Sequence, residues 1–372
     1  MIRLFISKVF FFLLPVILVV TIPVVILYNA REYFFDIDKL LKESPDYRIG
    51  YAYNESNYKI VKAKFLQLND KQTVIAVGSS RVLQFRAHLF DVPFYNAGYT
   101  ISRINDFIPF LEIIPKKKTP KILILGLDQW MFNENWDKLD SPSTKIDNRL
   151  NSTPSISTIK HVYRDLFNGK YSFSSFNTTN NSPLNIGLNA FVNKKGLRND
   201  GSMDYGDLLD QLKHDDSSVE DYQFKNTYRR IEKGIQRFEY GERINDRAIF
   251  ELEKLLKYCA NRKIKVVAFL PPFADEVKKK MDATGKYNYI ETIMPALSPY
   301  FNEFQFELYD FSNMGSFGGN DEELLDGFHG SEVAYAKILL TMINRNSILK
   351  KTVTRNNLEQ TIQHAKTPYS LE

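Results

Sequence analysis

The sequence predicts an α/β protein with three layers, in which helices cover a doubly wound, parallel five-stranded sheet. Short apolar runs of strand length alternate with longer segments of helical periodicity, and the alternation resumes after a long interruption in mid-chain. Strands are predicted at 73–77, around Phe94, and at 121–126, 264–270 and 306–311. Helices are predicted from Arg81 and from Ser102, and at 245–262, 289–297 and 331–344.

An uncharged apolar run, 9–28, lies near the N-terminus. As a helix rising about 1.5 Å per residue, a run of this length crosses the roughly 30 Å hydrocarbon layer of a membrane. A cleaved signal peptide is the alternative, but Tyr28 and Asn29 fit its small-residue cleavage site badly. Because Arg3 and Lys8 precede the run, Met1 is expected in the cytoplasm, and the sequence predicts a single-pass anchor.

Four regions follow from these patterns: an anchor at 1–30, a stalk or packing arm at 31–72, an α/β domain at 73–350 and a polar tail at 351–372. An insertion at about 133–241 interrupts the α/β domain and shows no clear period. Structureless connections of that length are rare in compact domains, so we expect a small cap. Arg198 lies in segment 196–202 of this insertion, which is rich in turn-forming residues, and is a candidate substrate contact. The alternative is a plain hairpin turn at Asp200 and Gly201.

Composition narrows the function classes. The 49 basic and 44 acidic residues are spread along the chain without a basic block, so nucleic acid is not an expected partner. The single cysteine, Cys259, lies in a helical run and is expected to be buried as a small apolar residue. No metal and no cofactor are expected, because metal-binding spacing is absent from the five histidines, which are His88, His161, His214, His329 and His364.

The first predicted strand ends in Gly78, Ser79, Ser80 and Arg81. Ligands bind at the carboxyl edge of a parallel sheet, which makes Ser80 a candidate nucleophile, and N–H groups at the start of the following helix are candidate oxyanion donors. An ordinary turn is one alternative. Another is an anion-binding turn with Arg81 as counter-charge, although the segment lacks a Walker lysine and the full GxGxxG pattern.

A second candidate element, running from Asp326 to His329, directly precedes the last predicted helix. At this spacing a carboxylate and an imidazole on one loop can bond to each other, which fixes the tautomer of the ring while its other nitrogen faces Ser80. An Asp-Gly turn with a surface histidine is the alternative.

The combination of a Gly-x-Ser turn after the first strand and an Asp-x-x-His before the last helix resembles the SGNH (GDSL-like) hydrolase superfamily. The segment from Asn96 to Gly98 is similar to the block whose glycine donates an N–H to the oxyanion. Gly126-Leu127-Asp128 is similar to the Gly-x-Asn block. The resemblance departs from the family at Ser79, where an acidic residue is usual, and at Asp128, which has no amide to donate.

The Gly-Ser-Ser form, the apolar N-terminal run and the Gly-Leu-Asp-Gln-Trp segment are similar to envelope subfamilies that include proteins of D-alanyl-lipoteichoic acid biosynthesis and alginate O-acetylation. This resemblance implies a bacterial inner-membrane protein with a periplasmic domain. It also implies an esterase or O-acyltransferase acting on a cell-surface glycan, beside a membrane-bound O-acyltransferase. The implied catalytic triad is Ser80, Asp326 and His329. The residues that the resemblance places at the oxyanion are Asn96, Gly98 and Asp128. Arg81 and Arg198 are added as candidate substrate contacts from their positions in the sequence.

A catalytically inactive, glycan-binding or scaffolding subunit of the same fold is the alternative. An ionised Asp128 beside the oxyanion would oppose the charge that develops there, which favours this alternative. Trp130, Phe132 and Trp136 are candidates for stacking on sugar rings in either case, with packing in the core as the competing interpretation.

Overall fold

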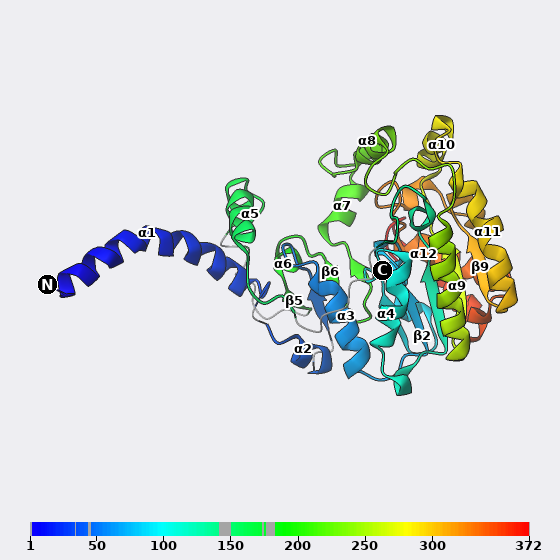
Figure 1. The fold of residues 1–372 in the computed structure, drawn as a ribbon, viewed down its shortest axis with the longest axis horizontal. Helices are drawn as coiled ribbons and strands as arrows, with labels where there is room; N and C mark the ends of the chain where they lie inside the picture. Colours follow the sequence, from blue (N-terminus) through cyan, green and yellow to red (C-terminus); the bar gives the residue numbers. More distant parts are fainter. Residues whose placement is uncertain are drawn as a thin grey trace. The chain divides into compact units, whose positions relative to one another are not determined.

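The computed structural model describes residues 2–33, 35–43, 46–140, 150–172, 175 and 183–371. The chain forms two compact units, drawn together in Figure 1. The smaller unit comprises Met1–Asn57, Arg149–Asn199 and Asp204–Asp207, and the larger comprises Tyr58–Asn148, Asp200–Met203 and Leu208–Glu372. The predicted insertion therefore contributes to both units, and its residues 141–149, 173, 174 and 176–182 lie outside the described residues.

A parallel five-stranded sheet is the centre of the larger unit. Its order is β3-β2-β4-β8-β9 and every neighbouring pair is parallel, which confirms the predicted α/β class and sheet. The first strand of the sheet lies between the second and the third, so the switch point at which ligands bind in such sheets is between β2 and β4. The strands are β2 (Val74–Val77), β3 (Phe94–Ala97), β4 (Ile122–Gly126), β8 (Lys265–Leu270) and β9 (Glu307–Asp310).

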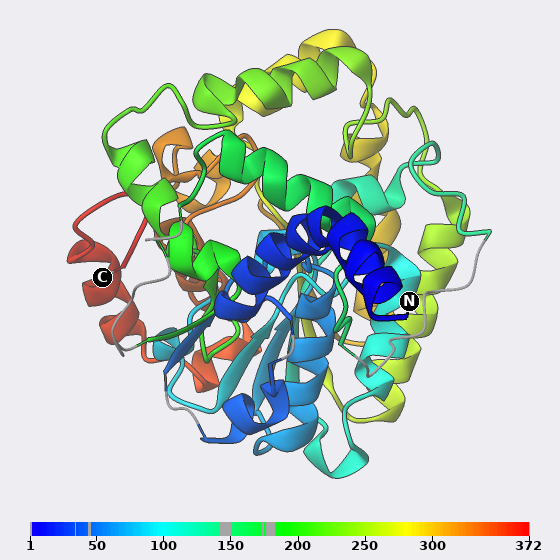
Figure 2. The same ribbon diagram turned by 90° about the vertical axis from the view of Figure 1, so that its left-hand side faces the viewer.

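Helices cover both faces of this sheet, as Figure 2 shows. On one face α4 (Phe107–Glu112) contacts α9 (Asp246–Asn261), which contacts α11 (Tyr289–Glu303). On the other, α12 (Glu332–Asn344) packs against α13 (Arg355–Gln363).

The sequence of α9 shows why the helix forms where it does. The Asn245 side chain accepts the N–H of Arg247 and caps the helix, and a buried stripe that includes Leu252, Leu256 and Cys259 faces the core. Cys259 is buried as expected, and burial raises the pKa of its thiol to about 12.

The helix predicted from Arg81 does not form. The chain after β2 makes two short 3-10 turns, η1 (Ser80–Val82) and η2 (Ala87–Leu89). The Asn96 amide donates to the carbonyls of Val82 and Phe85, which an α-helix would use for its own hydrogen bonds. Consequently no helix dipole of full strength points at Ser80.

Several helical segments of the larger unit were not predicted, and they include α3 (Asn57–Leu68) and α7 (Asp207–Lys213). α10 (Asp275–Thr284) follows β8, and α13 lies in the tail that was expected to be peripheral. α11 continues to Glu303 through two prolines that had suggested an end at Leu297. It continues because Ile293, Leu297 and Phe301 remain on its buried face.

The smaller unit has its own sheet, in the order β5-β1-β6-β7. β1 pairs with β5 in parallel and with β6 in antiparallel orientation. The strands are β1 (Tyr47–Ile49), β5 (Leu184–Ile186), β6 (Gly196–Leu197) and β7 (Met203–Asp204). The helices are α1 (Ile2–Asn29), α2 (Ile37–Glu43), α5 (Ile156–Phe167) and α6 (Leu188–Val192).

The N-terminal helix bears on the predicted anchor. In the described part of the chain, no single helix is long and apolar enough to cross a membrane. α1 is bent by 58° between Phe5–Pro15 and Val19–Asn29, and these two halves together have the length and composition of a span. Its apolar side chains are largely exposed, and examples are Phe5, Phe11 and Phe12. The anchor stays a prediction.

Candidate active site

Three side chains from opposite ends of the larger unit's sequence meet at the carboxyl edge of the sheet. The Oγ of Ser80, directly after β2, lies 2.8 Å from the Nε2 of His329. The Nδ1 of His329 lies 2.7 Å from the Oδ2 of Asp326. The side chains of His329 and Asp326 are 17% and 26% exposed, so solvent reaches them. This is the arrangement of a nucleophile, a general base and the carboxylate that orients the base.

Asp326 holds its loop as well as the imidazole. Its Oδ1 accepts the backbone N–H groups of Phe328 and His329, at 2.9 and 2.8 Å. Burial raises the pKa of this carboxyl, but His329 and the two N–H donors lower it by more, so the pKa is below its usual value. Asp326 is therefore ionised at neutral pH and selects the tautomer with a proton on Nδ1.

The carboxylate of Asp221, a residue that the sequence did not indicate, also holds this loop in place. Its Oδ2 accepts the N–H of Gly327 at 3.0 Å, and its two oxygens also bind the N–H and hydroxyl of Thr227. A Cβ on Gly327 would lie 2.7 Å from the Thr227 side chain, so glycine is required there. No signal in the sequence links Asp221 to a loop a hundred residues away.

Arg81, which was expected near the substrate, is fully buried, and its hydrogen bonds are made to groups within the protein. Its guanidinium donates to the carbonyl of Phe328 at 2.9 Å, to the carbonyl of Pro272 at 2.6 Å and to the side chain of Gln129 at 2.7 Å. Gln129 in turn donates to Pro271 and Ser312, after β8 and β9. Arg81 thus ties the ends of several strands to the backbone next to His329, which is a positioning role rather than a substrate contact.

Asn96 and Gly98 are also engaged within the protein. The N–H of Gly98 donates to the Oδ1 of Asn96 at 2.8 Å, so the donor expected to face an oxyanion already has an acceptor. Asn96 is fully buried. Among the described residues, the N–H of Ser80 at the start of η1 has no protein acceptor, which leaves it available to an oxyanion.

Asp128 stands at the end of β4 where the resemblance would place an amide. Its side chain is 1% exposed, and its Oδ1 lies 3.4 Å from Nη1 of Arg81. Its Oδ2 has no hydrogen-bond partner within the described part of the chain. Burial raises the pKa of Asp128 above its usual value, although the charge of Arg81 lowers it in part. Protonation would remove the repulsion between this carboxyl and an oxyanion.

No family model matches this chain, and no curated protein matches its sequence. The case for the site therefore depends on its own geometry. Among the described residues, no group of three His, Cys, Asp or Glu side chains is placed to hold a metal ion.

Arg198 belongs to the smaller unit, where its Nη2 lies 3.7 Å from the Oδ1 of Asp204. Its role as a substrate contact stays a prediction. The turn at Asp200 and Gly201 is present, and Gly201 has a φ of 79°. Trp130 and Phe132 are buried and Trp136 packs against the core, which supports core packing over sugar stacking.

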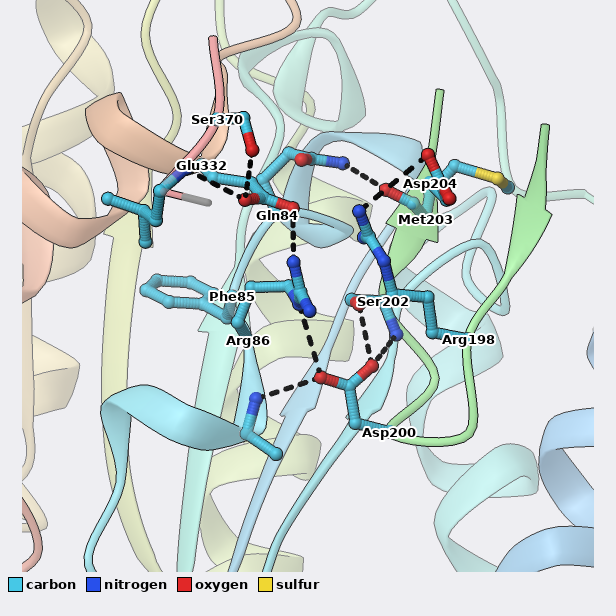
Figure 3. A network of polar contacts seen from close by, with 12 residues as sticks. Gln84, Phe85, Arg86, Arg198, Asp200, Ser202, Met203, Asp204, Glu332 and Ser370 are labelled. Carbon is cyan, nitrogen blue, oxygen red and sulfur yellow. Dashed lines mark hydrogen bonds and ion pairs between the residues drawn. The ribbon is translucent and has the colours of Figure 1, made fainter. Parts of the chain in front are cut away.

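A buried ion network in the larger unit joins Arg86 to Asp200 and to Glu332, the first residue of α12 (Figure 3). Arg86 donates to Glu332 at 2.6 Å and pairs with Asp200 at 3.5 Å. The other oxygen of Glu332 accepts the N–H of Leu371 and the hydroxyl of Ser370. The C-terminal residues are thereby attached to the first turn of the helix that follows His329.

Proposed function

We propose that this chain is an SGNH-type serine acyl esterase or O-acyltransferase with Ser80 as nucleophile. The single observation that supports it best is the pair of contacts from Ser80 to His329 and from His329 to Asp326. Their position at the switch point between β2 and β4 is where an open parallel sheet binds its ligand.

The proposed reaction has two steps. In the first, the Oγ of Ser80 attacks an ester carbonyl while Nε2 of His329 takes the hydroxyl proton and passes it to the leaving alcohol, which gives a seryl ester. In the second, water or a glycan hydroxyl attacks the seryl ester and gives its proton to His329. Ser80 then recovers the proton. Asp326 remains ionised throughout and stabilises the imidazolium.

We also propose a cellular location and a substrate class for this enzyme. The exposed apolar side chains of α1 support a membrane anchor, with the bent helix lying in lipid and the α/β domain in the periplasm. The resemblance to envelope subfamilies supports a cell-surface glycan as acceptor and a membrane-bound O-acyltransferase as partner.

A second candidate function is favoured by a specific observation. The N–H of Gly98 is bonded to Asn96, and Asp128 offers no amide, so two of the three expected oxyanion donors are missing. The alternative is a non-catalytic, glycan-binding or scaffolding subunit with the same fold.

A serine-directed fluorophosphonate separates the two candidates. Its phosphorus is attacked by an activated serine oxygen with loss of fluoride, so the full-length enzyme in detergent should be labelled, with the mass increase on the peptide that contains Ser80. Ser80→Ala should lose the label and Ser316→Ala, at an exposed serine distant in sequence, should keep it. Wild-type protein that stays unlabelled while folded would reject the enzyme and support the binding subunit.

A further inference from the structure

Two arginines that sequence analysis did not single out lie against aromatic rings of the candidate site. α8 (Lys225–Lys233) carries Arg230, whose guanidinium carbon is 5.8 Å from the ring centre of Phe328. Arg237, in the loop after this helix, lies 5.1 Å from the ring centre of Trp130. The Phe328 ring lies 4.4 Å, centre to centre, from the imidazole of His329, and Trp130 follows Asp128 by two positions, so both rings belong to the surroundings of the reacting residues. Figure 1 shows α8 in green, next to α10.

The two rings belong to one aromatic group. Trp130 and Phe328 meet edge to face, with centres 6.3 Å apart, and Phe238 packs on Phe328 at 5.6 Å. Arg81 lies 5.1 Å from the ring centre of Trp130, like Arg237, but is buried and saturated with protein acceptors. Arg237 is half-buried, so part of this residue remains accessible to solvent.

Among the described residues, Arg230 and Arg237 have no close acidic partner, although the charge of Arg237 acts on the buried carboxyl of Asp128 and lowers its pKa. In the part of the chain that the structure describes, neither forms an ion pair with a carboxylate or donates a side-chain hydrogen bond, and the Nε of Arg230 is buried without a partner. A buried donor without an acceptor is unfavourable, and an anionic ligand would satisfy it. Arg229, by contrast, is exposed and donates to Asn226.

The backbone at Arg237 has an energetically unfavourable conformation. Gln236 and Arg237 both have left-handed φ angles, 56° and 77°, which non-glycine residues rarely adopt. The burial of the next residue, Phe238, between Phe273 and Phe328 stabilises this backbone conformation. Strained non-glycine residues of this kind concentrate at ligand-binding positions.

We propose that Arg230 and Arg237 form a subsite for an anionic oxygen group, a phosphate or carboxylate, on the substrate whose acyl group reaches Ser80. The assignment of this group to a substrate rests on the proposed function. Guanidinium forks match the geometry of both oxyanions, and stacking on an aromatic ring orients the fork before the ligand arrives. The ester substrate would accordingly be part of an anionic glycopolymer rather than a neutral one.

Direct anion binding tests the subsite without any turnover. Full-length protein in detergent is titrated with inorganic phosphate and, separately, with acetate at constant ionic strength, while the fluorescence of Trp130 is followed in a Trp136→Phe background. A saturable change with at least one anion is expected, and the anion with the greater effect identifies the chemistry. Arg237→Gln and Arg230→Gln should weaken binding about tenfold or more, and Arg229→Gln should bind as wild type.

A kinetic comparison connects the subsite to the reaction. The matched pair is 4-acetoxybenzoate, which carries a carboxylate, and its neutral methyl ester. Arg237→Gln should raise KM for the anionic ester about tenfold while changing KM for the neutral ester less than twofold. An equal change for both esters would overturn the proposal.

The two experiments distinguish a failure of the subsite from a failure of the proposed catalysis. If neither ester is hydrolysed but phosphate or acetate still binds to wild type and Ser80→Ala and not to the Arg237 variant, the subsite stands and the proposed catalysis falls. If wild type binds neither anion, or if the variants bind as wild type does, the subsite is rejected whether or not esters are hydrolysed. Circular dichroism and the melting temperature establish that each variant is folded.

Discussion

Two carboxyl groups, one in each unit of the chain, show how the partners of a carboxyl group decide whether it is ionised. Asp326 in the larger unit accepts backbone N–H groups of its own loop, and Glu32 in the smaller unit accepts those of Ala52 and Tyr53. Asp326 also faces an imidazole at 2.7 Å. In the described residues, Glu32 has no cationic side chain within ion-pair distance. The pKa of Asp326 is lowered, and the pKa of Glu32 is raised to about 7.

Glu32 is the more instructive of the two because its hydrogen bonds alone do not keep it ionised. Its Oε1 accepts the N–H groups of Ala52 and Tyr53, at 2.8 and 2.7 Å, and its Oε2 accepts the N–H of Leu188 at 2.7 Å. Desolvation by burial outweighs these donors and raises the pKa. A carboxylate that must remain charged, as the orienter of a catalytic histidine must, needs a group that can become cationic as well as dipoles.

The largest expected effect comes from removing the charge of Asp326. In Asp326→Asn the amide can still accept the N–H groups of Phe328 and His329, but its NH₂ faces Nδ1 and favours the wrong tautomer. The rate of ester hydrolysis should fall about a thousandfold or more with little loss of stability. Single-turnover acylation measured with 4-acetoxybenzoate checks this.

Asp321 provides the matched control for that substitution. Its carboxylate accepts the N–H groups of Asp275 and Glu276 at the start of α10, without an imidazole partner. Asp321→Asn should therefore leave acylation within about twofold of wild type. Equal losses in the two variants would show that Asp326 acts only by holding its loop, and the comparison with Glu32 would lose its meaning.

The part of the site that could be predicted is the part encoded by local patterns. Ser80 lies in the turn that follows a strand of a parallel sheet, and Asp326 and His329 share one loop, so turn position and spacing suffice to indicate that they converge. Asp221 and Arg237 reach the site from segments with no period of their own, and only tertiary packing shows their contacts.

The fold follows the same division. The five strands could be predicted because each is a short apolar run. The prediction of a helix after β2 was wrong because the side chain of Asn96 donates hydrogen bonds to the carbonyls of Val82 and Phe85. The hydrogen bond from the N–H of Gly98 to Asn96 could not be predicted for the same reason, since a motif shows that an N–H exists but not which acceptor it binds.

A smaller effect is expected from Glu32, and it depends on pH. A carboxyl whose pKa is about 7 in the folded protein and about 4.5 in the unfolded chain binds its proton more tightly when folded. Its contribution to stability is complete below about pH 4.5, is lost as the pH rises to about 7, and then stays level. Hydrogen-exchange protection of the Ala52, Tyr53 and Leu188 amides should fall across that interval.

Glu32→Gln should remove this pH dependence. Its Oε1 keeps two of the N–H donors, but its NH₂ faces the N–H of Leu188, so at pH 5 the smaller unit should lose about 1–3 kcal/mol. Glu43→Gln, at an exposed position on α2, should keep the wild-type pH profile. Protection that rises with pH in the wild type, after correction for the intrinsic exchange rate, would show that the hydrogen bonds of Glu32 outweigh its desolvation.

The smallest effect concerns Asp165, a carboxylate in the same unit as Glu32 that does have cationic partners. Lys170 lies 3.0 Å from its Oδ1, and the hydroxyl of Tyr53 donates to its Oδ2 at 2.8 Å. Burial raises the pKa of Asp165, but Tyr53 and Lys170 lower it below its usual value. Its stabilisation is therefore present above the unfolded pKa and is lost as the pH falls through the folded pKa.

Lys170→Met should raise the pKa of Asp165 toward its usual value. Since the Lys170 side chain is 59% exposed, the loss at pH 7 should be no more than about 1 kcal/mol. It should be smaller at pH 3, because the stabilisation is lost as the pH falls through the lowered pKa of Asp165. Thermal unfolding at the two pH values measures the difference, with Lys160→Met, an exposed lysine on α5, as control. A loss that is the same at both pH values would mean that Lys170 contributes through packing. The cationic partner would then not be what distinguishes Asp165 from Glu32.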